Sequence, residues 1–473
     1  MLTLADAFEA LTNTRPGIPE WVITEAVVDS RQTIPGGMFV ALPGERVDGH
    51  DFVAEAFKRG ASFALVEREI PSNFSILDFR KNNTPAWNKT TTLPLCLIVD
   101  NSLMALQRIA AFWRKKLSVR VIGITGSVGK STTKEIVAEV LSQRYHTLKN
   151  PGNLNNEIGL PLTLLKLGPG YERAVLEMGF YIPGEIKFLC DIAMPSVGIV
   201  TNIGTVHAER AGSQEDIARG KSELVQSLPP APEGTAILNY DDPWVRWMAD
   251  KTRAKIFYYG LDPQADLWAD EVESEGLEGI RFTLHYKDEV FHTRAPMIGQ
   301  HSVHTALRAA AVGLIEGLTW QEIFNGLQRG HTQLRMVAVR TESGAMLLDD
   351  TYNASPESML AALNLLEEME GRKIAVLGDM LELGQYERQG HEMVGVRAAR
   401  VTNILLTLGE KAHMIAEAAK RSGMEKDQIF EYEDIGPVID WLRTNLTSHD
   451  SVLVKGSHGL RMDRITSSLE VQA

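Results

Sequence analysis

The residues with the clearest chemical potential lie in one glycine-rich segment, Gly123–Thr133, which reads GITGSVGKSTT. A short apolar run, Val119–Ile124, leads into its turn, and a helical pattern begins near Ser131. Glycines let backbone N–H groups point at phosphate oxygens, and the start of a helix adds positive potential there. Lys130 would reach the terminal phosphates of a nucleotide, and the Ser131 hydroxyl would ligate Mg²⁺. The predicted nucleotide contacts in this segment are Gly126, Ser127, Val128, Gly129, Lys130, Ser131 and Thr132.

The segment matches a shortened form of the phosphate-loop pattern. Ile124 stands where the longer pattern G-x-x-x-x-G-K-[ST] has its first glycine, so only G-x-x-G-K-[ST] is present. A glycine-rich turn that binds nothing is the alternative interpretation of that shorter string. The strand before the turn and the helix after it favour nucleotide binding.

A carboxylate at a further strand end indicates a metal site beside the loop, and a histidine follows the next strand. Glu177 ends a predicted strand and His207 follows the next one, at the edge where doubly wound sheets bind ligands. A carboxylate suits Mg²⁺, whereas a lone histidine, taken by itself, is more often a hydrogen-bonded loop residue. A solvated glutamate and a hydrogen-bonded loop histidine are the simpler alternatives for these two residues.

Three regions must position these residues, and their patterns predict an α/β fold. The first, residues 1–100, holds short strands broken by glycine and proline. In the second, residues 101–318, alternating strands and helices predict a mostly parallel sheet, with antiparallel strands added at 267–298. The third, residues 319–473, repeats the alternation and predicts a smaller doubly wound domain.

Composition excludes several classes of protein. The 473 residues are 44% hydrophobic and 23% charged, which is typical of globular domains and not of disordered, collagen-like or coiled-coil chains. With 48 Lys plus Arg and 61 Asp plus Glu, the net charge is 48 − 61 = −13, which disfavours non-specific binding to nucleic acid or anionic membrane.

The location of the protein is predicted from similar observations. Two cysteines, both in apolar surroundings, suit a reducing compartment. The first residues do not form a signal peptide, and no apolar run approaches the ~20 residues of a membrane-spanning helix. We therefore expect a soluble, cytoplasmic protein without membrane insertion, and a monomer.

Further strings accompany the phosphate loop in a defined order along almost the whole chain. They are Asp29–Arg31, Gly44–Phe52, Gly152–Leu165 (GNLNNEIGLPLTLL), Asp349–Asn353 (DDTYN), Val376–Gly384 (VLGDMLELG) and Lys455–Ser457. Together with the loop they resemble the Mur ligase family, the ATP-dependent amino-acid ligases of peptidoglycan synthesis. The resemblance implies a small α/β N-terminal domain that binds a UDP-sugar, a central P-loop domain that binds ATP, and a C-terminal Rossmann-like domain that completes the ATP and D-alanyl-D-alanine site.

The resemblance also implies a reaction. It is the ATP-dependent joining of D-alanyl-D-alanine to UDP-MurNAc-tripeptide through an acyl phosphate, giving UDP-MurNAc-pentapeptide, ADP and phosphate. The implied cofactors are ATP, Mg²⁺ and a carbamylated lysine at Lys221. Another amino-acid ligase of the same superfamily is one alternative, and a P-loop nucleotide hydrolase without ligase chemistry is the other.

The resemblance assigns residues to four roles. The implied catalytic residues are Lys130, His207 and Lys221. The implied metal ligands are Ser131, Glu177, His207 and Lys221. The implied UDP-sugar contacts are Ser30, Arg31, Asn155 and Asn156. The implied nucleotide contacts beyond the loop are His301, Thr305, Arg335, Asp350 and Asn353.

Several of these assignments have a structural alternative. Lys221 would be an ordinary surface lysine paired with Glu215 or Glu223, and Arg335 and Asp350 would take part in interdomain ion pairs. The remaining alternatives are a surface turn at Ser30 and Arg31, an Asx-type turn at Asn353 and a helix start at His301.

The sequence departs from the family pattern beside the predicted base. Ser302 and Thr305 stand where the family usually has two asparagines, the second of which helps hold adenine. A hydroxyl replaces only part of the two-way hydrogen bonding of an amide, so we expect weaker discrimination between purine bases.

Overall fold

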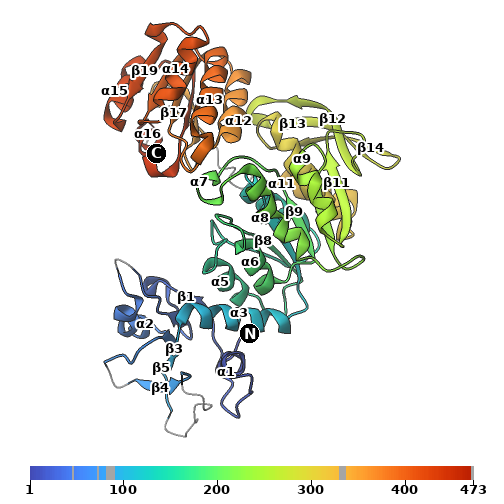
Figure 1. The fold of residues 1–473 in the computed structure, drawn as a ribbon, viewed down its shortest axis with the longest axis vertical. Helices are drawn as coiled ribbons and strands as arrows, with labels where there is room; N and C mark the ends of the chain where they lie inside the picture. The colour runs from blue at the N-terminus through green and yellow to red at the C-terminus, as the bar shows by residue number, and fades with distance from the viewer. Residues whose placement is uncertain (45–46, 72–73, 81–90, 330–336, 470–473) are drawn as a thin grey trace.

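Three β-sheets organise the chain, and each is the centre of its own body (Figure 1). This computed structural model describes residues 1–44, 47–71, 74–80, 91–329 and 337–469. The N-terminal, central and C-terminal bodies follow one another along the long axis of the molecule (Figure 1). The predicted α/β class with three domains is confirmed, whereas the domain boundaries at residues 100 and 318 stay predictions.

The N-terminal body is a parallel sheet in the order β1-β2-β3-β5-β4. Its first helix begins at a capping box, in which Thr3 and Asp6 satisfy each other's backbone N–H groups. The long helix α3 joins this body to the central one: Arg114, near its end, is buried and donates to the carbonyls of Ala193 and Val119. The elements are α1 (Leu4–Thr12), β1 (Ala26–Val27), β2 (Met38–Val40), α2 (Val53–Lys58), β3 (Phe63–Val66), β4 (Ser75–Asp78), β5 (Leu95–Ile98) and α3 (Ser102–Lys116).

The central body is a nine-stranded sheet in the order β14-β13-β12-β11-β10-β9-β6-β8-β7. The strands from β7 to β12 are parallel, and β12, β13 and β14 are antiparallel, as predicted for residues 267–298. The strands are β6 (Arg120–Thr125), β7 (Thr147–Lys149), β8 (Arg173–Glu177), β9 (Val197–Val200), β10 (Thr235–Asn239), β11 (Lys255–Gly260), β12 (Leu267–Ser274), β13 (Ile280–Tyr286) and β14 (Glu289–Ala295).

Helices cover both faces of the central sheet, because its inner strands are apolar on both sides. In β6, Val121 packs in the core beneath α3, α5 and α6, whereas Ile122 and Ile124 pack in the opposite core beneath α4 and α10. Helix α11, which follows residue 318, packs on α4 and α10. The helices are α4 (Lys130–Leu141), α5 (Gly159–Leu165), α6 (Glu185–Ala193), α7 (Ala208–Ala211), α8 (Gln214–Gln226), α9 (Pro243–Trp247), α10 (Val303–Ile315) and α11 (Trp320–Arg329).

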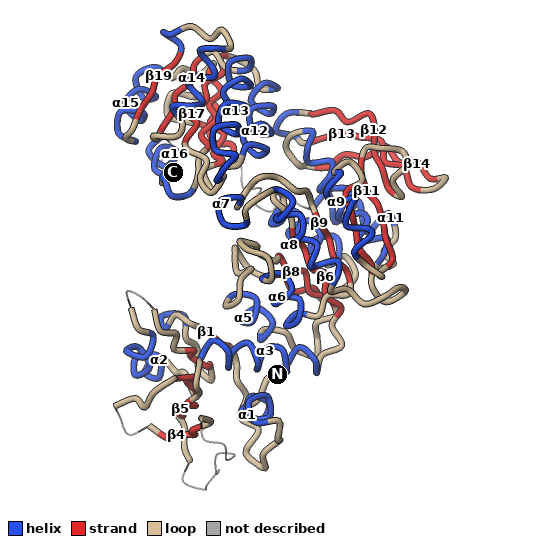
Figure 2. Tube along the Cα trace, in the orientation of Figure 1, coloured by secondary structure: helices blue, strands red, loops and turns tan. Residues whose placement is uncertain are grey.

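The C-terminal body is a six-stranded sheet in the order β15-β16-β20-β17-β18-β19, parallel except for β15. Helices α12, α13 and α14 pack on one face and α15 with α16 on the other, as a doubly wound domain requires (Figure 2). The elements are β15 (Val337–Arg340), β16 (Met346–Asp350), α12 (Pro356–Glu368), β17 (Arg372–Gly378), α13 (Glu387–Val401), β18 (Ile404–Leu408), α14 (His413–Arg421), β19 (Ile429–Tyr432), α15 (Ile435–Asn445), β20 (Asp450–Lys455) and α16 (Asp463–Leu469).

Sequence-based prediction did not name five strands, which include β1 and β4 of the N-terminal sheet. The other three are β7, β15 and β19. All three lie at the edges of their sheets and have three or four residues. Short edge strands are paired on one side only, so their sequences carry little apolar periodicity. Within the described part of the chain, no helix has the length and apolar character needed to cross a membrane.

Candidate active site

The phosphate loop connects β6 to α4 through two glycines with left-handed backbone. Gly126 has φ +145° and Gly129, which caps α4, has φ +83°. A Cβ on Gly126 would lie 1.8 Å from the hydroxyl oxygen of Thr201, so no larger residue fits. The loop therefore depends on glycine for backbone conformation and for close packing against the segment after β9.

That segment, Thr201–Gly204, fixes the shape of the loop through hydrogen bonds. Val128 N donates to Asn202 Oδ1 at 2.9 Å, and Gly204 N donates to Ser127 Oγ at 2.8 Å. The Thr201 hydroxyl donates to the carbonyl of Val128 at 2.7 Å. Asn202 is a site residue that the sequence analysis did not identify, although it belongs to a string that follows a strand end.

Lys130 lies over the loop that it terminates. Its Nζ donates to the carbonyl oxygens of Gly126 at 2.8 Å and Ser127 at 3.2 Å. This position holds a mobile positive charge beside the backbone N–H groups of the loop, where anionic oxygens of a nucleotide would lie.

Glu177 is buried and in contact with the loop. The Ser131 hydroxyl donates to Glu177 Oε2 at 2.6 Å, and Asn155 Nδ2 donates to Glu177 Oε1 at 2.9 Å. The carboxylate is 1% exposed, so the alternative of a solvated glutamate is wrong. Two of the predicted metal ligands are thus brought together, and their oxygens are of the type that Mg²⁺ prefers.

Lys221 is fully buried in α8 beside the same loop. Its Nζ donates to the carbonyl of Gly126 at 3.1 Å and lies 4.4 Å from the centre of the Phe180 ring. Burial and the nearby charge of Lys130 hold the pKa of Lys221 well below its ordinary value of 10.5.

The surface-lysine alternative for Lys221 is wrong. Glu215 pairs with Arg219 at 3.1 Å, and Glu223 accepts from the backbone N–H groups of Gly184 and Lys187. Both carboxylates that would have paired with a surface lysine therefore have other partners.

His207 contacts the C-terminal body. Its Nδ1 lies 2.7 Å from Glu382 Oε2, and both residues have left-handed backbone, with φ +71° and +64°. Burial, Lys221 and Lys130 lower the pKa of His207 to about 3, so the ring is neutral and Nδ1–H donates to the carboxylate. Among the described residues, no three or more His, Cys, Asp or Glu side chains are grouped so that they could hold a metal ion by themselves.

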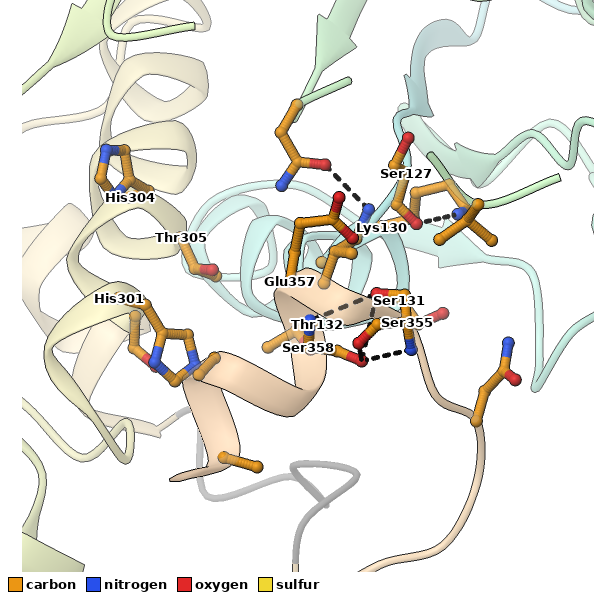
Figure 3. A pocket seen from close by; sticks show the side chains of 18 of the residues that line it. Ser127, Lys130, Ser131, Thr132, His301, His304, Thr305, Ser355, Glu357 and Ser358 are labelled. Carbon is orange, nitrogen blue, oxygen red and sulfur yellow. Dashed lines mark hydrogen bonds between the residues drawn. The ribbon is translucent and has the colours of Figure 1, made fainter. Parts of the chain in front are cut away.

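A cavity of about 430 Å³ lies between the central and C-terminal bodies (Figure 3). On the side of the central body, the phosphate loop and α10 form the wall of the cavity. On the side of the C-terminal body, the wall is formed by the start of α12 and the ends of β16 and β20. Predicted residues that line it are Ser127, Val128, Gly129, Lys130, Ser131, Thr132, His207, His301, Thr305, Asp350 and Asn353. Lining residues that the sequence analysis did not identify include Asn202, Arg308, Glu357 and Lys455.

Lys455 organises the C-terminal wall of the cavity. Its buried Nζ donates to Asp350 Oδ2 at 2.6 Å and to the carbonyl of Asn353 at 2.8 Å. The ion pair of Asp350 with Lys455 therefore lies within the C-terminal body. Arg335, the other residue for which an interdomain ion pair is the alternative, lies outside the described residues.

The predicted UDP-sugar residues do not gather at this cavity. Ser30 and Arg31 lie in the N-terminal body, where Arg31 is exposed and pairs with Asp29 at 2.8 Å. Asn156 Oδ1 accepts from Gly159 N at the start of α5. The roles of these residues and of Asn155 in binding a UDP-sugar stay predictions.

The fold and the site together define a class of protein. A phosphate loop at the end of a parallel strand, with buried charged side chains around it and a second α/β body completing its cavity, is the arrangement of a multidomain P-loop nucleotide-binding enzyme.

Comparison with known proteins agrees with this class. Residues 22–86 match the description "Mur ligase family, catalytic domain", residues 124–313 "Mur ligase middle domain", and residues 334–458 "Mur ligase, glutamate ligase domain". The chain is 35% identical to a UDP-N-acetylmuramoyl-tripeptide–D-alanyl-D-alanine ligase of Bacillus subtilis, over 97% of this chain and 95% of that protein. It is 34% identical to the enzyme of the same name from Escherichia coli, over 93% and 92% of the two chains.

Solved structures are similar along the whole chain. A structure of MurF from Acinetobacter baumannii has a TM-score of 0.84 at 30% identity and covers 98% of both chains. MurF from Thermotoga maritima in complex with ADP has a TM-score of 0.78 at 28% identity, over 95% of this chain and 98% of that one. The chain therefore belongs to the Mur ligase family, and it is an ATP-dependent ligase.

Proposed function

We propose that this enzyme joins D-alanyl-D-alanine to UDP-MurNAc-tripeptide, with conversion of ATP to ADP and phosphate. The observation that carries the proposal is the similarity over 97% of the chain to a ligase named for these substrates. The cavity between the phosphate loop and the C-terminal body supports it, because a ligase must hold a nucleotide beside its acceptor.

The chemistry requires that three anionic groups meet. A carboxylate is a poor acylating agent, so its oxygen first attacks the γ-phosphorus of ATP and ADP leaves. The amine then attacks the acyl phosphate, and phosphate leaves as the amide forms. Lys130 offsets the repulsion among these groups. The low-dielectric surroundings of the loop strengthen the attraction between its charge and the phosphates.

Mg²⁺ fits the donor set beside the loop. Ser131 Oγ and the Glu177 carboxylate converge within 2.6 Å of each other, and His207 Nε2 is available because Nδ1 contacts Glu382. We propose that Ser131, Glu177, His207 and modified Lys221 hold the ion, directly or through water. Bound there, Mg²⁺ would neutralise phosphate charge.

We propose that Lys221 is carbamylated by CO₂. Its neutral amine would attack the carbon of CO₂, an N–C bond would form, and one proton would leave to solvent, giving an anionic carbamate. A lowered pKa supplies the neutral amine that this reaction needs. The modification would exchange a buried amine near Lys130 for an anion with two oxygens.

The function is tested by the mass of the product. The enzyme with ATP, Mg²⁺, UDP-MurNAc-tripeptide and D-alanyl-D-alanine should give one new species, heavier than the tripeptide substrate by the dipeptide minus water. Single amino acids offered in place of the dipeptide test the alternative of another Mur ligase. Nucleotide hydrolysis without any amide product would indicate the hydrolase alternative and contradict the proposal.

Glu382 should position the metal ligand His207 from the C-terminal body. A carboxylate that accepts from one imidazole nitrogen orients the other toward a metal, and its loss typically lowers metal affinity about 10- to 100-fold. We therefore expect Glu382→Ala to raise the Mg²⁺ concentration that gives half-maximal ligation by about that factor.

Glu387→Ala is the matched control for Glu382→Ala. Glu387 belongs to α13 and pairs with Lys411 outside the cavity, so its removal should leave the Mg²⁺ requirement unchanged. An equal Mg²⁺ requirement in folded Glu382→Ala and wild type would show that Glu382 does not orient His207.

A cytoplasmic location and a monomeric state belong to the proposal as well. The two cysteines, Cys96 and Cys190, are buried and unpaired, which suits a reducing compartment.

A further inference from the structure

Arg308 is a buried cation on the wall of the cavity that the mechanism above does not use. It lies in α10 and is 4% exposed. Its Nη1 donates to the hydroxyl of Tyr259 at 3.2 Å, and its Nη2 donates to the hydroxyl of Thr305 at 2.8 Å. Burial raises the pKa of Tyr259, so that hydroxyl is neutral. Neither partner of the guanidinium carries a negative charge.

This environment leaves part of the hydrogen-bond donor capacity of the Arg308 guanidinium unused. Arginine has five N–H donors, and the two hydrogen bonds to hydroxyls occupy only part of them. The Nε of Arg308 is buried and has no hydrogen-bond partner among the described residues. A buried cation without an anion is destabilising, and an anionic ligand would offset that cost.

Arg114 shows how the chain satisfies a buried arginine elsewhere. It is 8% exposed and donates to the backbone carbonyls of Ala193, Leu117 and Val119. Arg308 lacks such a set of carbonyls and lines a cavity, whereas Arg114 does not. The two residues differ in the way expected of a ligand-binding and a structural arginine.

The place of Arg308 along α10 indicates which part of a nucleotide it meets. Thr305 and Arg308 lie on α10, His301 lies in the 3-10 turn just before it, and all three line the cavity. His301 and Thr305 are labelled in Figure 3. Arg308 is the one nearest the phosphate loop, because a Cβ on Gly129 would lie 3.4 Å from its Nη2. The base, at the far end of the nucleotide from the phosphates, would lie toward His301.

We propose that Arg308 is a phosphate-binding residue, which donates to the phosphate chain of the nucleotide from α10 while the loop and Lys130 bind it from the other side. The assignment rests on the proposed nucleotide site. A guanidinium suits this place because its planar fork matches two oxygens of one phosphate group.

The test compares nucleotide binding by variants with that of the wild type. ADP and GDP are titrated against wild type, Arg308→Met, Arg308→Lys and the control Arg114→Met, with the melting temperature of each measured without ligand. We expect Arg308→Met to weaken the binding of ADP and of GDP by similar factors of about 10 to 100, because a charge-assisted hydrogen bond to phosphate is lost. Arg308→Lys should show a smaller loss, and Arg114→Met should bind both nucleotides normally even where its melting temperature is lower.

A second readout uses the phosphate chain alone. Inorganic tripolyphosphate should raise the melting temperature of wild type and of Arg114→Met, and should raise that of Arg308→Met much less. This difference does not depend on any base contact and would not arise from a purely structural role of Arg308.

The outcomes separate the assignment from the proposed function. If wild type binds ADP tightly and folded Arg308→Met binds it equally tightly, the phosphate-binding role of Arg308 is overturned, while the nucleotide site itself stands. Weaker ADP binding by Arg308→Met with unchanged GDP binding would place Arg308 at the base, which also overturns the assignment. If Arg308→Met does not fold, normal affinity in Arg308→Lys together with normal tripolyphosphate stabilisation contradicts the proposal. Wild type that binds neither nucleotide would contradict the nucleotide site itself.

Discussion

Lys130→Ala should abolish ligation, with a decrease in kcat of about a thousandfold or more and little change in folding. Lys130 places its Nζ over the carbonyls of Gly126 and Ser127, at the point where the transferring phosphate would lie. Alanine removes that charge from the transition state, whereas the glycines and the segment after β9 still hold the loop. Product formation under saturating substrates measures the effect, and the melting temperature checks the fold.

Lys187→Ala is the control for Lys130→Ala. Lys187 is an exposed lysine that pairs with Asp191 on the surface of α6, away from the cavity. Its removal should change neither kcat nor the melting temperature appreciably, since exposed pairs contribute little. Near-normal ligation by folded Lys130→Ala would remove this lysine from the mechanism.

Lys221→Ala should lose most of its activity, by about a hundredfold or more, and formate or acetate should restore part of it. The substitution removes the long stem that would carry the carbamate oxygens beside the loop. A small carboxylate can enter the space left behind and supply similar oxygens. Ligation rates with and without about 0.1 M formate measure the rescue, at an ionic strength matched with chloride.

Lys134→Met is the control for the rescue. Lys134 is another buried lysine, but its Nζ donates to the carbonyls of Asn150 and Gly152, so its removal disturbs a loop and leaves no metal ligand missing. Formate should not restore activity to this variant. Wild-type turnover by Lys221→Ala in CO₂-depleted buffer would contradict the carbamate proposal.

Lys221 should also affect stability in a way that depends on pH. Its folded-state pKa lies well below 10.5, so between these two values the unfolded chain binds a proton that the folded chain does not. Wild-type stability therefore falls as pH falls through this range. In CO₂-depleted buffer, Lys221→Met should melt above wild type, and the difference should widen as the pH is lowered from about 10. A constant difference across that range would contradict the lowered pKa.

The sequence by itself determined the phosphate loop and the alternation of strands and helices. Glycines at positions 126 and 129 are required by backbone conformation within a few residues, and apolar periodicity reports which segments are buried. For the same reason the antiparallel strands after Leu267 and the doubly wound C-terminal body were predictable. Short edge strands such as β7, β15 and β19 were not, since a short strand with one neighbour needs no regular apolar pattern.

The tertiary structure decided which charged residues act together. Nothing local distinguishes Lys221 from a surface lysine, yet packing of α8 against Phe180 and the loop buries it completely. Glu382 reaches His207 only because the C-terminal body lies against the central one, and Arg308 in an alanine-rich helix becomes a cavity residue only because α10 passes the loop. Local sequence specifies backbone conformation over a few residues. The burial and partners of a charge depend on chain segments tens of positions to more than a hundred positions away, which only the folded structure brings together.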